Sequence, residues 1–495
     1  MWTSINQALN IIDNFVWGVP LMVLIIAGGL LLTIRLGLLQ IRKLPLALKW
    51  MLQNEEGGKG EISSFSALCT ALSATIGTGN IVGVATAVCA GGPGALFWMV
   101  VAAFLGMATK YSEGLLAVKY RTVAEDGHSL GGPFYYIELG MGKKFKWLAK
   151  IFAFFGVCVG LFGIGTFSQV NGISSAVHGF FDPNDAFTVK ILPFLGEYSW
   201  SVVIASLILS FCVAAVLIGG VKRIASVSQI IVPFMAVIYF VFAVILICCN
   251  ITKVPAAFAT IVTAAFSPKA ITGGAVGSML IAMQKGVARG IFSNEAGLGS
   301  APIAAAAAQT NSPVRQGLVS MTGTFIDTII ICTLTGLSIV LTGAWQVEGL
   351  EGVQVTTYAF QHGLPFPAQF SSFILMLCLV FFAFTTILGW DYYSERCLEY
   401  LSGGNMKHVK IFRWIYILAV FIGPYMTVSA VWTIDDIFNG LMAIPNMIAL
   451  FALSGVIVKE TRAFFQHAKE EALAEHRSFE EVCEENLNEE EAPAN

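Results

Sequence analysis

Charged residues are scarce in this chain. They make up 12% of its 495 residues, whereas hydrophobic residues make up 56%. Soluble domains carry about 25% charged residues, so the composition excludes a water-soluble globular protein. One crossing of a bilayer needs about 20 apolar residues. Most of the chain is therefore predicted to lie in the membrane, with lipid as a partner.

Motifs that would indicate other functions are absent as well. The sequence has no HExxH, GxSxG or Walker A motif, so we do not expect an enzyme. It has no CxxC pair and no Cys/His spacing suited to a structural metal. The net charge of -3 comes without a basic stripe, which argues against nucleic acid as a partner. Neither a continuous polar pore lining nor a sizeable ligand domain is evident, so a channel or a receptor is also disfavoured.

What the sequence does contain is a series of apolar runs. Several of them include glycine or proline, which membrane helices tolerate when neighbouring groups satisfy the freed backbone. The runs lie at residues 16–36, 65–90, 94–118, 147–178, 199–219, 227–249, 256–291, 316–344, 368–392, 411–430 and 434–458. The sequence therefore predicts an all-α polytopic membrane protein with eleven transmembrane helices.

The basic residues orient these spans. If the N-terminus lies outside, only Lys190, Lys253 and Lys269 of the 28 lysines and arginines fall on the outer side. Short cytoplasmic loops normally hold most of the basic residues. We therefore expect the N-terminus outside and the C-terminus in the cytoplasm. Short loops without a targeting segment favour a multi-pass protein of a prokaryotic plasma membrane.

Two apolar runs are interrupted by glycine. The second run contains Gly77 and Gly79 among hydrogen-bonding side chains, and the seventh is interrupted at residues 271–278. The interruptions lie five spans apart, and an odd number of spans per half inverts the second half in the membrane. This pattern points to an inverted-repeat secondary transporter with its site near the midplane.

The interruptions also divide the chain into four predicted parts. Residues 1–60 form an N-terminal helix and a basic cytoplasmic loop, and residues 459–495 form an acidic cytoplasmic tail. The first five-helix repeat covers residues 61–250, and the second covers residues 251–458.

An interrupted membrane helix offers unusual chemistry. Unwound backbone exposes N–H groups, and the positive end of the next half-helix faces an anion such as an amino-acid carboxylate. Free carbonyl groups of the other half-helix face a cation. One short segment can thus hold a zwitterion and a sodium ion. The alternative is that Gly79 and Gly83 only allow close helix packing, but the flanking Thr75 and Asn80 argue against it.

Three sequence blocks resemble a known family. Residues 91–99 (GGPGALFWM), 292–302 (FSNEAGLGSAP) and 382–390 (FAFTTILGW) are similar to signatures of the alanine or glycine:cation symporters, usually called sodium:alanine symporters. With the segment around Gly77, the likeness extends over residues 15–460. One position departs: Val100 stands where the family usually has a second tryptophan.

The resemblance implies a leucine-transporter-type fold. This fold has ten core helices in a 5+5 inverted repeat, here with one extra N-terminal helix. It also implies a secondary active symporter that couples sodium influx to the uptake of a small neutral amino acid, alanine or glycine, by alternating access. Sodium-driven glutamine uptake and a proton-coupled amino-acid symporter stay open as alternatives, and the oligomeric state is left open.

The same resemblance implies a site at the first interruption. Residues 77–80 look like the Gly-x-Gly-Asn break of the first core helix in this fold. By that likeness Thr75, Gly77, Thr78 and Gly79 border the substrate, with the amides of Thr78 and Gly79 on its carboxylate. The Asn80 amide oxygen and the Thr75 carbonyl would bind one sodium ion, since a hard cation prefers oxygen ligands.

Further ion ligands are expected in the second half. Related folds place adjacent hydroxyls like those of Thr385 and Thr386 on a second sodium ion, beside carbonyls near Ile76. The alternative is that these hydroxyls bond their own helix carbonyls. Asp327 lies inside the eighth span, where an ionisable group indicates function by default. It is expected to help bind sodium, or to be protonated and structural.

The remaining candidates border the substrate. The family likeness favours Gln169 near the substrate, with Gly165 leaving room for its side chain, although an interhelical hydrogen bond is the ordinary role of such a residue. Ala275 would border the pocket, where its small size would admit a substrate as bulky as glutamine. Trp390 either caps the substrate cavity or anchors the chain at the membrane interface.

Two polar segments are placed at the cytoplasmic side. Lys110 and Glu113 are expected to snorkel or pair toward the inner end of the third span. Residues 293–295 (SNE) are expected to form part of an inner gate or a loop cap.

Overall fold

The computed structural model describes most of the chain. The described residues are 8, 9, 11–13, 15–53, 58, 60–124, 127–190, 197–266, 275–425, 428–474 and 482, and the side chains of residues 275–278, 428–432, 473 and 474 are outside the description. Within this part the chain is helical apart from two small antiparallel hairpins. One hairpin pairs β1 (Thr122–Val123) with β2 (Ser129–Leu130), and the other pairs β3 (Thr188–Lys190) with β4 (Glu197–Ser199).

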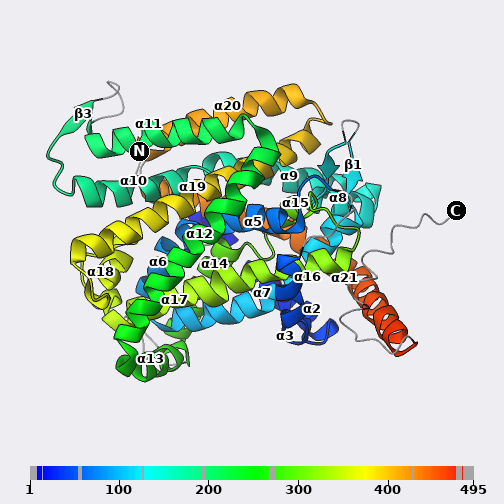
Figure 1. Ribbon diagram of the computed structural model, residues 1–495, viewed down its shortest axis with the longest axis horizontal. Coiled ribbons are helices and arrows are strands. Elements are labelled where there is room, and N and C mark those ends of the chain that lie inside the picture. The colour runs from blue at the N-terminus through cyan, green and yellow to red at the C-terminus, as the bar shows by residue number, and fades with distance from the viewer. Residues whose placement is uncertain are drawn as a thin grey trace.

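The first half of the chain forms one bundle of helices with the second half (Figure 1). Its helices, in order, are α2 (Val19–Arg35), α3 (Leu39–Arg42), α4 (Leu44–Leu52), α5 (Ser64–Thr75), η1 (Thr78–Asn80), α6 (Val82–Gly91), α7 (Gly94–Lys119), α8 (Pro133–Tyr135), η2 (Tyr136–Gly140), η3 (Lys143–Phe145), α9 (Lys146–Phe162), α10 (Phe167–Phe181), α11 (Trp200–Leu217) and α12 (Gly220–Cys249).

The second half is also made of helices that differ widely in length. They are η4 (Ile251–Lys253), α13 (Val254–Phe266), α14 (Ala275–Asn294), α15 (Ala301–Ala305), α16 (Pro313–Thr324), η5 (Phe325–Cys332), α17 (Thr333–Thr342), η6 (Ala344–Gln346), α18 (Val353–Gly363), α19 (Ala368–Leu401), α20 (Met406–Ile422), η7 (Gly423–Tyr425) and α21 (Val428–Ala474). The predicted border at residue 458 falls inside α21, so the acidic tail does not begin at a helix end.

Seven described helices are long and apolar enough to cross a membrane, and the bent pair α5–α6 makes up to eight. These eight match predicted spans. The other three predicted spans correspond to α2, to α13 with α14, and to α20, and the first and last of these helices have only 17 residues each. The all-α polytopic membrane class is thus confirmed, and the number eleven stays a prediction.

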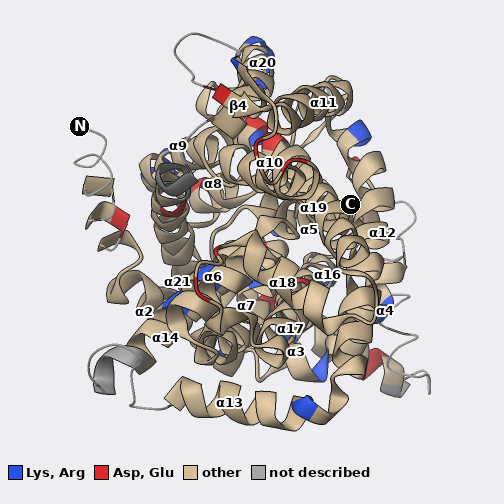
Figure 2. Ribbon diagram, turned by 90° about the vertical axis from the view of Figure 1, so that its left-hand side faces the viewer, with Lys and Arg blue, Asp and Glu red and all other residues tan. Residues whose placement is uncertain are grey.

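The outer helices carry their apolar side chains on the surface of the bundle. On α11 and α12 the side chains of Phe211, Ile230 and Phe234 are exposed. A helix that is apolar on every face is typical of a membrane span. Charged residues are few along most helices and stand out singly in Figure 2. This surface fits lipid rather than water.

The predicted seventh span, an interrupted apolar run, contains the two helices α13 and α14. Helix α13 lies lengthwise across Figure 2, where α10 and α11 are seen nearly end-on. Residues 267–274 between them are outside the described part. The 13 residues of α13 are too few to cross a bilayer, so α13 alone does not make a span.

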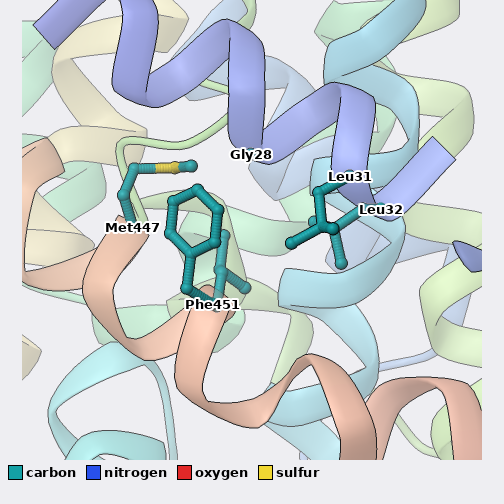
Figure 3. A pocket seen from close by; sticks show the side chains of 6 residues that line it. Gly28, Leu31, Leu32, Met447 and Phe451 are labelled. Atoms are coloured by element: carbon teal, nitrogen blue, oxygen red, sulfur yellow. The ribbon is translucent and has the colours of Figure 1, made fainter. Parts of the chain in front are cut away.

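Glycine brings the extra N-terminal helix against the last one. A Cβ at Gly28 of α2 would lie 2.2 Å from the Met447 side chain of α21 and 3.3 Å from the Phe451 ring. Figure 3 shows both side chains facing Gly28 across a small apolar gap. Small residues allow this close approach in membrane proteins, so α2 packs onto the second half of the bundle.

Candidate functional site

The α5–α6 interruption is present where the sequence predicts it. Helix α5 ends at Thr75, Gly77 is extended, and the short helix η1 precedes α6. The two half-helices are bent by 61°. A Cβ at Gly77 would lie 2.5 Å from the Thr386 hydroxyl oxygen and 2.9 Å from Gln169 Oε1. Glycine is therefore required here because side chains of other helices approach the backbone closely.

Asn80 joins this interruption to Asp327. Its Oδ1 accepts the Gly77 N–H at 2.9 Å, which fixes the amide so that Nδ2 faces the second half of the chain. Nδ2 donates to Asp327 Oδ1 at 2.7 Å and to the Asp327 carbonyl at 3.2 Å. Both residues are fully buried. The predicted ion ligands Asn80 and Asp327 thus lie in direct contact.

Asp327 is surrounded by donors. Ser293 donates to its Oδ2 at 2.8 Å and Thr328 does so at 2.6 Å, while Thr328 itself accepts from Asn294 Nδ2. An ionised carboxylate accepts hydrogen bonds only, so this set of donors fits the charged form. Asp327 lies on the π-helical segment η5, a local distortion that often marks functional sites.

Gln169 contacts the other side of the interruption. Its Oε1 accepts the Thr78 N–H at 3.0 Å. Among the described residues, Gln169 Nε2 and Thr78 Oγ1 have no hydrogen-bond partner although both side chains are buried. Buried polar groups are normally paired. The backbone N–H, the amide and the hydroxyl together form a set of donors suited to a carboxylate.

The two threonines of α19 behave differently. Thr386 donates to the Ile76 carbonyl at 3.3 Å and to Phe382 in its own helix at 3.0 Å, so it does reach the interruption. The printed bonds of Thr385 go to carbonyls of Phe381 and Phe382 and to the sulfur of Met235. Thr386 meets its expected neighbour, whereas Thr385 follows the alternative of bonding its own helix.

A second interruption lies between α14 and α15, at residues 295–300. Glu295, Gly297 and Gly299 have positive φ angles of 57°, 92° and 83°. The predicted interruption at 271–278 lies partly outside the described residues: 271–274 are not described, and Ala275–Ser278 are the first residues of α14. Residues 293–295, expected to form part of an inner gate or a loop cap, are buried where α14 ends and this interruption begins.

Side chains of α7 hold this second interruption. Lys110 donates to the Asn294 carbonyl at 2.7 Å, and Glu113 accepts the Gly297 N–H at 3.1 Å. Both are buried, which is inconsistent with snorkelling toward water, one of the two roles expected for them. Their stems lie inside the bundle because the unwound backbone needs charged partners there.

Trp390 is part of the same cluster. Its indole N–H donates to Glu295 Oε1 at 2.8 Å, Ser300 donates to Glu295 Oε2 at 2.6 Å, and Trp390 is 1% exposed. A buried side chain of this kind is inconsistent with an interfacial anchor, one of the two roles considered for it. A Cβ at Gly165 would lie 2.5 Å from the Gly160 carbonyl oxygen and 2.8 Å from the Trp390 Cβ. Gly165 therefore packs against Gly160 and Trp390, and its role in leaving room for Gln169 stays a prediction.

The third interruption, between α9 and α10, was not predicted from the sequence. The span at 147–178 breaks between α9 and α10, where residues 163–166 are not helical. The Gly165 carbonyl accepts the Tyr416 hydroxyl at 2.7 Å, and the Ile164 N–H is donated to Asp435. Gly163 and Gly165, two glycines one residue apart within an apolar run, are the sequence feature that could have predicted this interruption.

The structure gathers most of the predicted site residues. Those at the α5–α6 interruption or in contact with it are Thr75, Ile76, Gly77, Thr78, Gly79, Asn80, Gln169, Asp327 and Thr386. Gly165, in the α9–α10 interruption, lies against Trp390, which contacts Glu295 at the second interruption. Thr385 is one residue from Thr386. The side chain of Ala275 is outside the description. A small hollow borders Thr75 and Lys110.

This arrangement defines a class of protein. Interrupted membrane helices whose backbone and buried polar side chains converge inside the bundle are the construction of secondary transporters. The structure of MhsT in complex with L-phenylalanine, a LeuT-fold transporter, is similar to this chain with a TM-score of 0.53 and 12% identity, covering 88% of this chain and 97% of MhsT. This likeness supports the LeuT-like fold.

Sequence comparison gives the family. Residues 2–478 match the sodium:alanine symporter family, and the chain belongs to it. Sodium/alanine symporter AgcS of Methanococcus maripaludis is 46% identical over 94% of this chain and 98% of its own. An uncharacterized transporter of Haemophilus influenzae is 55% identical over 94% of this chain and 97% of its own. The chain is thus a sodium-coupled amino-acid symporter by family, and not an enzyme.

Proposed function

We propose that the chain couples sodium influx to the uptake of a small neutral amino acid, alanine or glycine, by alternating access in a prokaryotic plasma membrane. The observation that carries this proposal is the α5–α6 interruption. It presents the Thr78 N–H with the Gln169 amide on one side, and Asn80 with Asp327 on the other. One segment can therefore bind both the carboxylate of the amino acid and the sodium ion.

The substrate carboxylate binds at Thr78 and Gly79. Gln169 Oε1 accepts the Thr78 N–H here, so the carboxylate replaces that oxygen when the amide turns and presents Nε2 instead. The N–H groups at the start of α6 add the positive end of a helix dipole. Thr75 and Gly77 border the substrate from the α5 side.

Sodium binds on the Asn80 side. Asn80 Oδ1 and the Thr75 carbonyl are the ligands at the first position, with Asp327 supplying the negative charge. A second position lies between the Ile76 carbonyl and Thr386, which already meet at 3.3 Å. Thr385 adds its hydroxyl only after leaving its own helix carbonyls.

Close packing favours a small substrate. A Cβ at Gly79 would lie 3.2 Å from the Phe292 ring and 3.3 Å from Ser293 Cα. The AgcS relative is named a sodium/alanine symporter, and a relative of Bacillus subtilis, 35% identical, is named a probable sodium/glutamine symporter. Alanine or glycine is the primary proposal, and glutamine is the alternative if Ala275 opens the pocket.

The geometry favours sodium over a proton. The Asp327 carboxylate accepts hydrogen bonds from Asn80 and Thr328. Gly77 and Asn294 in turn hold these two donor side chains in place. A protonated carboxyl would need the Ser293 or Thr328 hydroxyl to turn and accept its O–H. Asp327 therefore serves as a fixed negative charge beside the ion rather than as a proton carrier.

Uptake into proteoliposomes tests the function. Purified protein is loaded into vesicles, and radiolabelled alanine is added with an inward sodium gradient or with choline in place of sodium. Saturable uptake only with sodium is expected, and unlabelled glycine should compete. Equal uptake in choline would reject sodium coupling. Competition by glutamine as strong as that by alanine would select the alternative substrate.

A further inference from the structure

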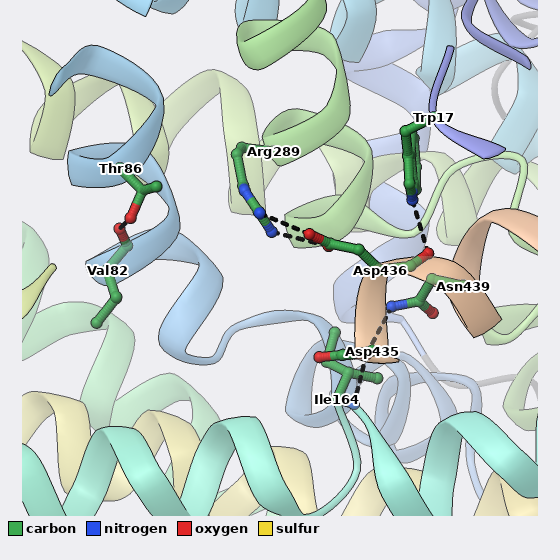
Figure 4. Close-up of polar contacts among 8 residues, drawn as sticks. All are labelled: Trp17, Val82, Thr86, Ile164, Arg289, Asp435, Asp436 and Asn439. Carbon is green, nitrogen blue, oxygen red and sulfur yellow. Dashed lines mark hydrogen bonds and ion pairs between the residues drawn. The ribbon is translucent and has the colours of Figure 1, made fainter. Parts of the chain in front are cut away.

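The α9–α10 interruption is held by a side chain from the last helix. The Ile164 N–H donates to Asp435 Oδ1 at 2.7 Å. A Cβ at Gly163 would lie 2.5 Å from the same oxygen, so glycine is needed for this approach. Figure 4 shows Asp435 between Ile164 and Asn439, on the first turns of α21. None of these residues belongs to the α5–α6 site.

Asp435 is only half satisfied. Its Oδ1 accepts from Ile164 and from Asn439 Nδ2 at 3.0 Å. Its Oδ2 has no hydrogen-bond partner among the described residues, and the same is true of Asn439 Oδ1, although both side chains are 0% exposed. The Ser168 hydroxyl makes a long bond of 3.4 Å to the Gly163 carbonyl and is also a neighbour of the Asp435 carboxyl. Two buried acceptor oxygens thus lie on one face of α21.

The hydrogen bonds formed among the described residues satisfy neither protonation state of Asp435 fully. If the carboxyl is ionised, Oδ2 is a charged oxygen in the interior without a bonded donor, which is costly. If it is protonated, the two N–H donors at Oδ1 leave Oδ2 to carry the proton, and that O–H must turn to the Ser168 hydroxyl or to Asn439 Oδ1 for an acceptor. Buried polar groups without partners are rare and call for an explanation.

The local charges favour a cation as the missing partner. Arg289 binds Asp436 through two bonds of 2.9 and 2.6 Å. The same guanidinium attracts Asp435 and Asp13, and Lys285 attracts Asp13. Three carboxyl groups therefore share one bound guanidinium and one lysine, so this end of the cluster carries a net negative charge when all three are ionised.

We propose that Asp435 and Asn439 form a sodium site at the α9–α10 interruption, separate from the α5–α6 site. Asp435 supplies the carboxylate. A half-turn of the Asn439 amide brings its oxygen to the position of Nδ2, beside the carboxylate, and the two then converge as oxygen ligands for a hard cation. The ion ties the interruption to α21. This inference shares with the proposed function only the identity of the ion.

Equilibrium binding of radioactive sodium to the purified, detergent-solubilised protein tests the site without any transport. Choline keeps the ionic strength constant, and no amino acid is added. Asp435→Asn should bind one sodium ion per chain fewer than the unaltered protein, and Asn439→Ala should bind that ion about tenfold more weakly. Asp185→Asn is the matched control because Asp185 is exposed and pairs with His178. It should bind as the unaltered protein does.

Asp327→Asn separates this inference from the proposed function. If it loses an ion while Asp435→Asn and Asn439→Ala lose none, the site at α21 does not exist and the proposed function stands. If only Asp435→Asn loses an ion, the new site stands and the ion site at Asn80 is wrong. Asn439→Ala keeps the Ile164 contact, so it carries the test if Asp435→Asn does not fold.

Discussion

At Asp327, the charge of one carboxylate is distributed over bonds from three helical segments. Asn80, Ser293 and Thr328 all donate to it. The sequence identified Asn80 and Asp327 because a polar residue in an apolar run stands out. It assigned Ser293 to an inner gate or a loop cap and not to Asp327, because a serine next to Asn294 and Glu295 looks like part of a polar loop when the three-dimensional contact is unknown.

Asp327→Asn should raise the sodium concentration for half-maximal uptake by about 10- to 100-fold. The substitution keeps the size of the side chain but removes the negative charge beside the ion. Uptake rates at varied sodium, with choline as replacement, measure the effect. Asp185→Asn, which removes an exposed charge, is the control. An unchanged sodium dependence would remove Asp327 from the ion site.

Gln169→Leu should raise the KM for alanine by roughly tenfold or more, because the side chain loses a hydrogen bond to a charged group worth about 1.5–3 kcal/mol. The half-saturating sodium concentration should change less. Asn171→Leu, two residues further along α10, is the matched control because no hydrogen bond joins Asn171 to the α5–α6 interruption among the described contacts. If both variants transport alike, Gln169 does not contact the substrate.

At the scale of elements, the glycines made the α5–α6 interruption visible in the sequence but did not do so for the interruption at residues 295–300. Gly77 and Gly79 fall in the middle of an apolar run, so the interruption of α5–α6 is visible in the sequence. Gly297 and Gly299 follow Glu295 at the end of a run, where glycine and charge ordinarily indicate a loop. Only the contacts of Lys110, Glu113 and Trp390 show that this segment is inside the bundle.

Gly77→Ala should abolish uptake, because the new methyl group would lie 2.5 Å from the Thr386 hydroxyl and 2.9 Å from Gln169 Oε1. Gly83→Ala in α6 is the matched control, since no atom lies within 4 Å of a Cβ there. Initial uptake rates and the amount of folded protein are compared for both. Normal transport by Gly77→Ala would show that the interruption does not need this close approach.

Trp390→Phe should lower the thermal stability, because Glu295 loses a donor while it stays buried. Leaving such a group unsatisfied costs about 1–3 kcal/mol. The melting temperature of the purified protein is the measurement. Trp414→Phe, at a side chain that is 61% exposed, should melt as the unaltered protein does. Equal melting of both variants would mean that the Glu295 contact is not needed to hold the second interruption.

At the scale of the whole molecule, the class of fold follows from composition and from the apolar runs. The exact set of crossings does not, because the apolar run at 256–291 contains two helices, α13 and α14, and α13 is too short to cross alone (Figure 2). Likewise, α9 and α10 form one run and yet are separated by residues 163–166. Hydropathy measures how apolar a segment is, not where its axis turns.

The membrane potential should drive accumulation if sodium carries net charge inward. One charge crossing 100 mV gains about 2.3 kcal/mol, which corresponds to roughly 40-fold accumulation at about 1.4 kcal/mol per decade. Proteoliposomes with equal sodium on both sides and a potassium diffusion potential, negative inside, measure this. Dissipating the potential with an ionophore is the control. Accumulation that ignores the potential would indicate electroneutral transport.

The bond between Asn80 Oδ1 and the Gly77 N–H carries one last implication. The oxygen proposed to hold sodium already stabilises the bend of the chain, so an arriving ion must take it from the backbone. Filling the position and reshaping the turn are then a single event. A carrier built in this way resists uncoupled transport, because sodium cannot bind there alone without disturbing the binding site of the amino acid.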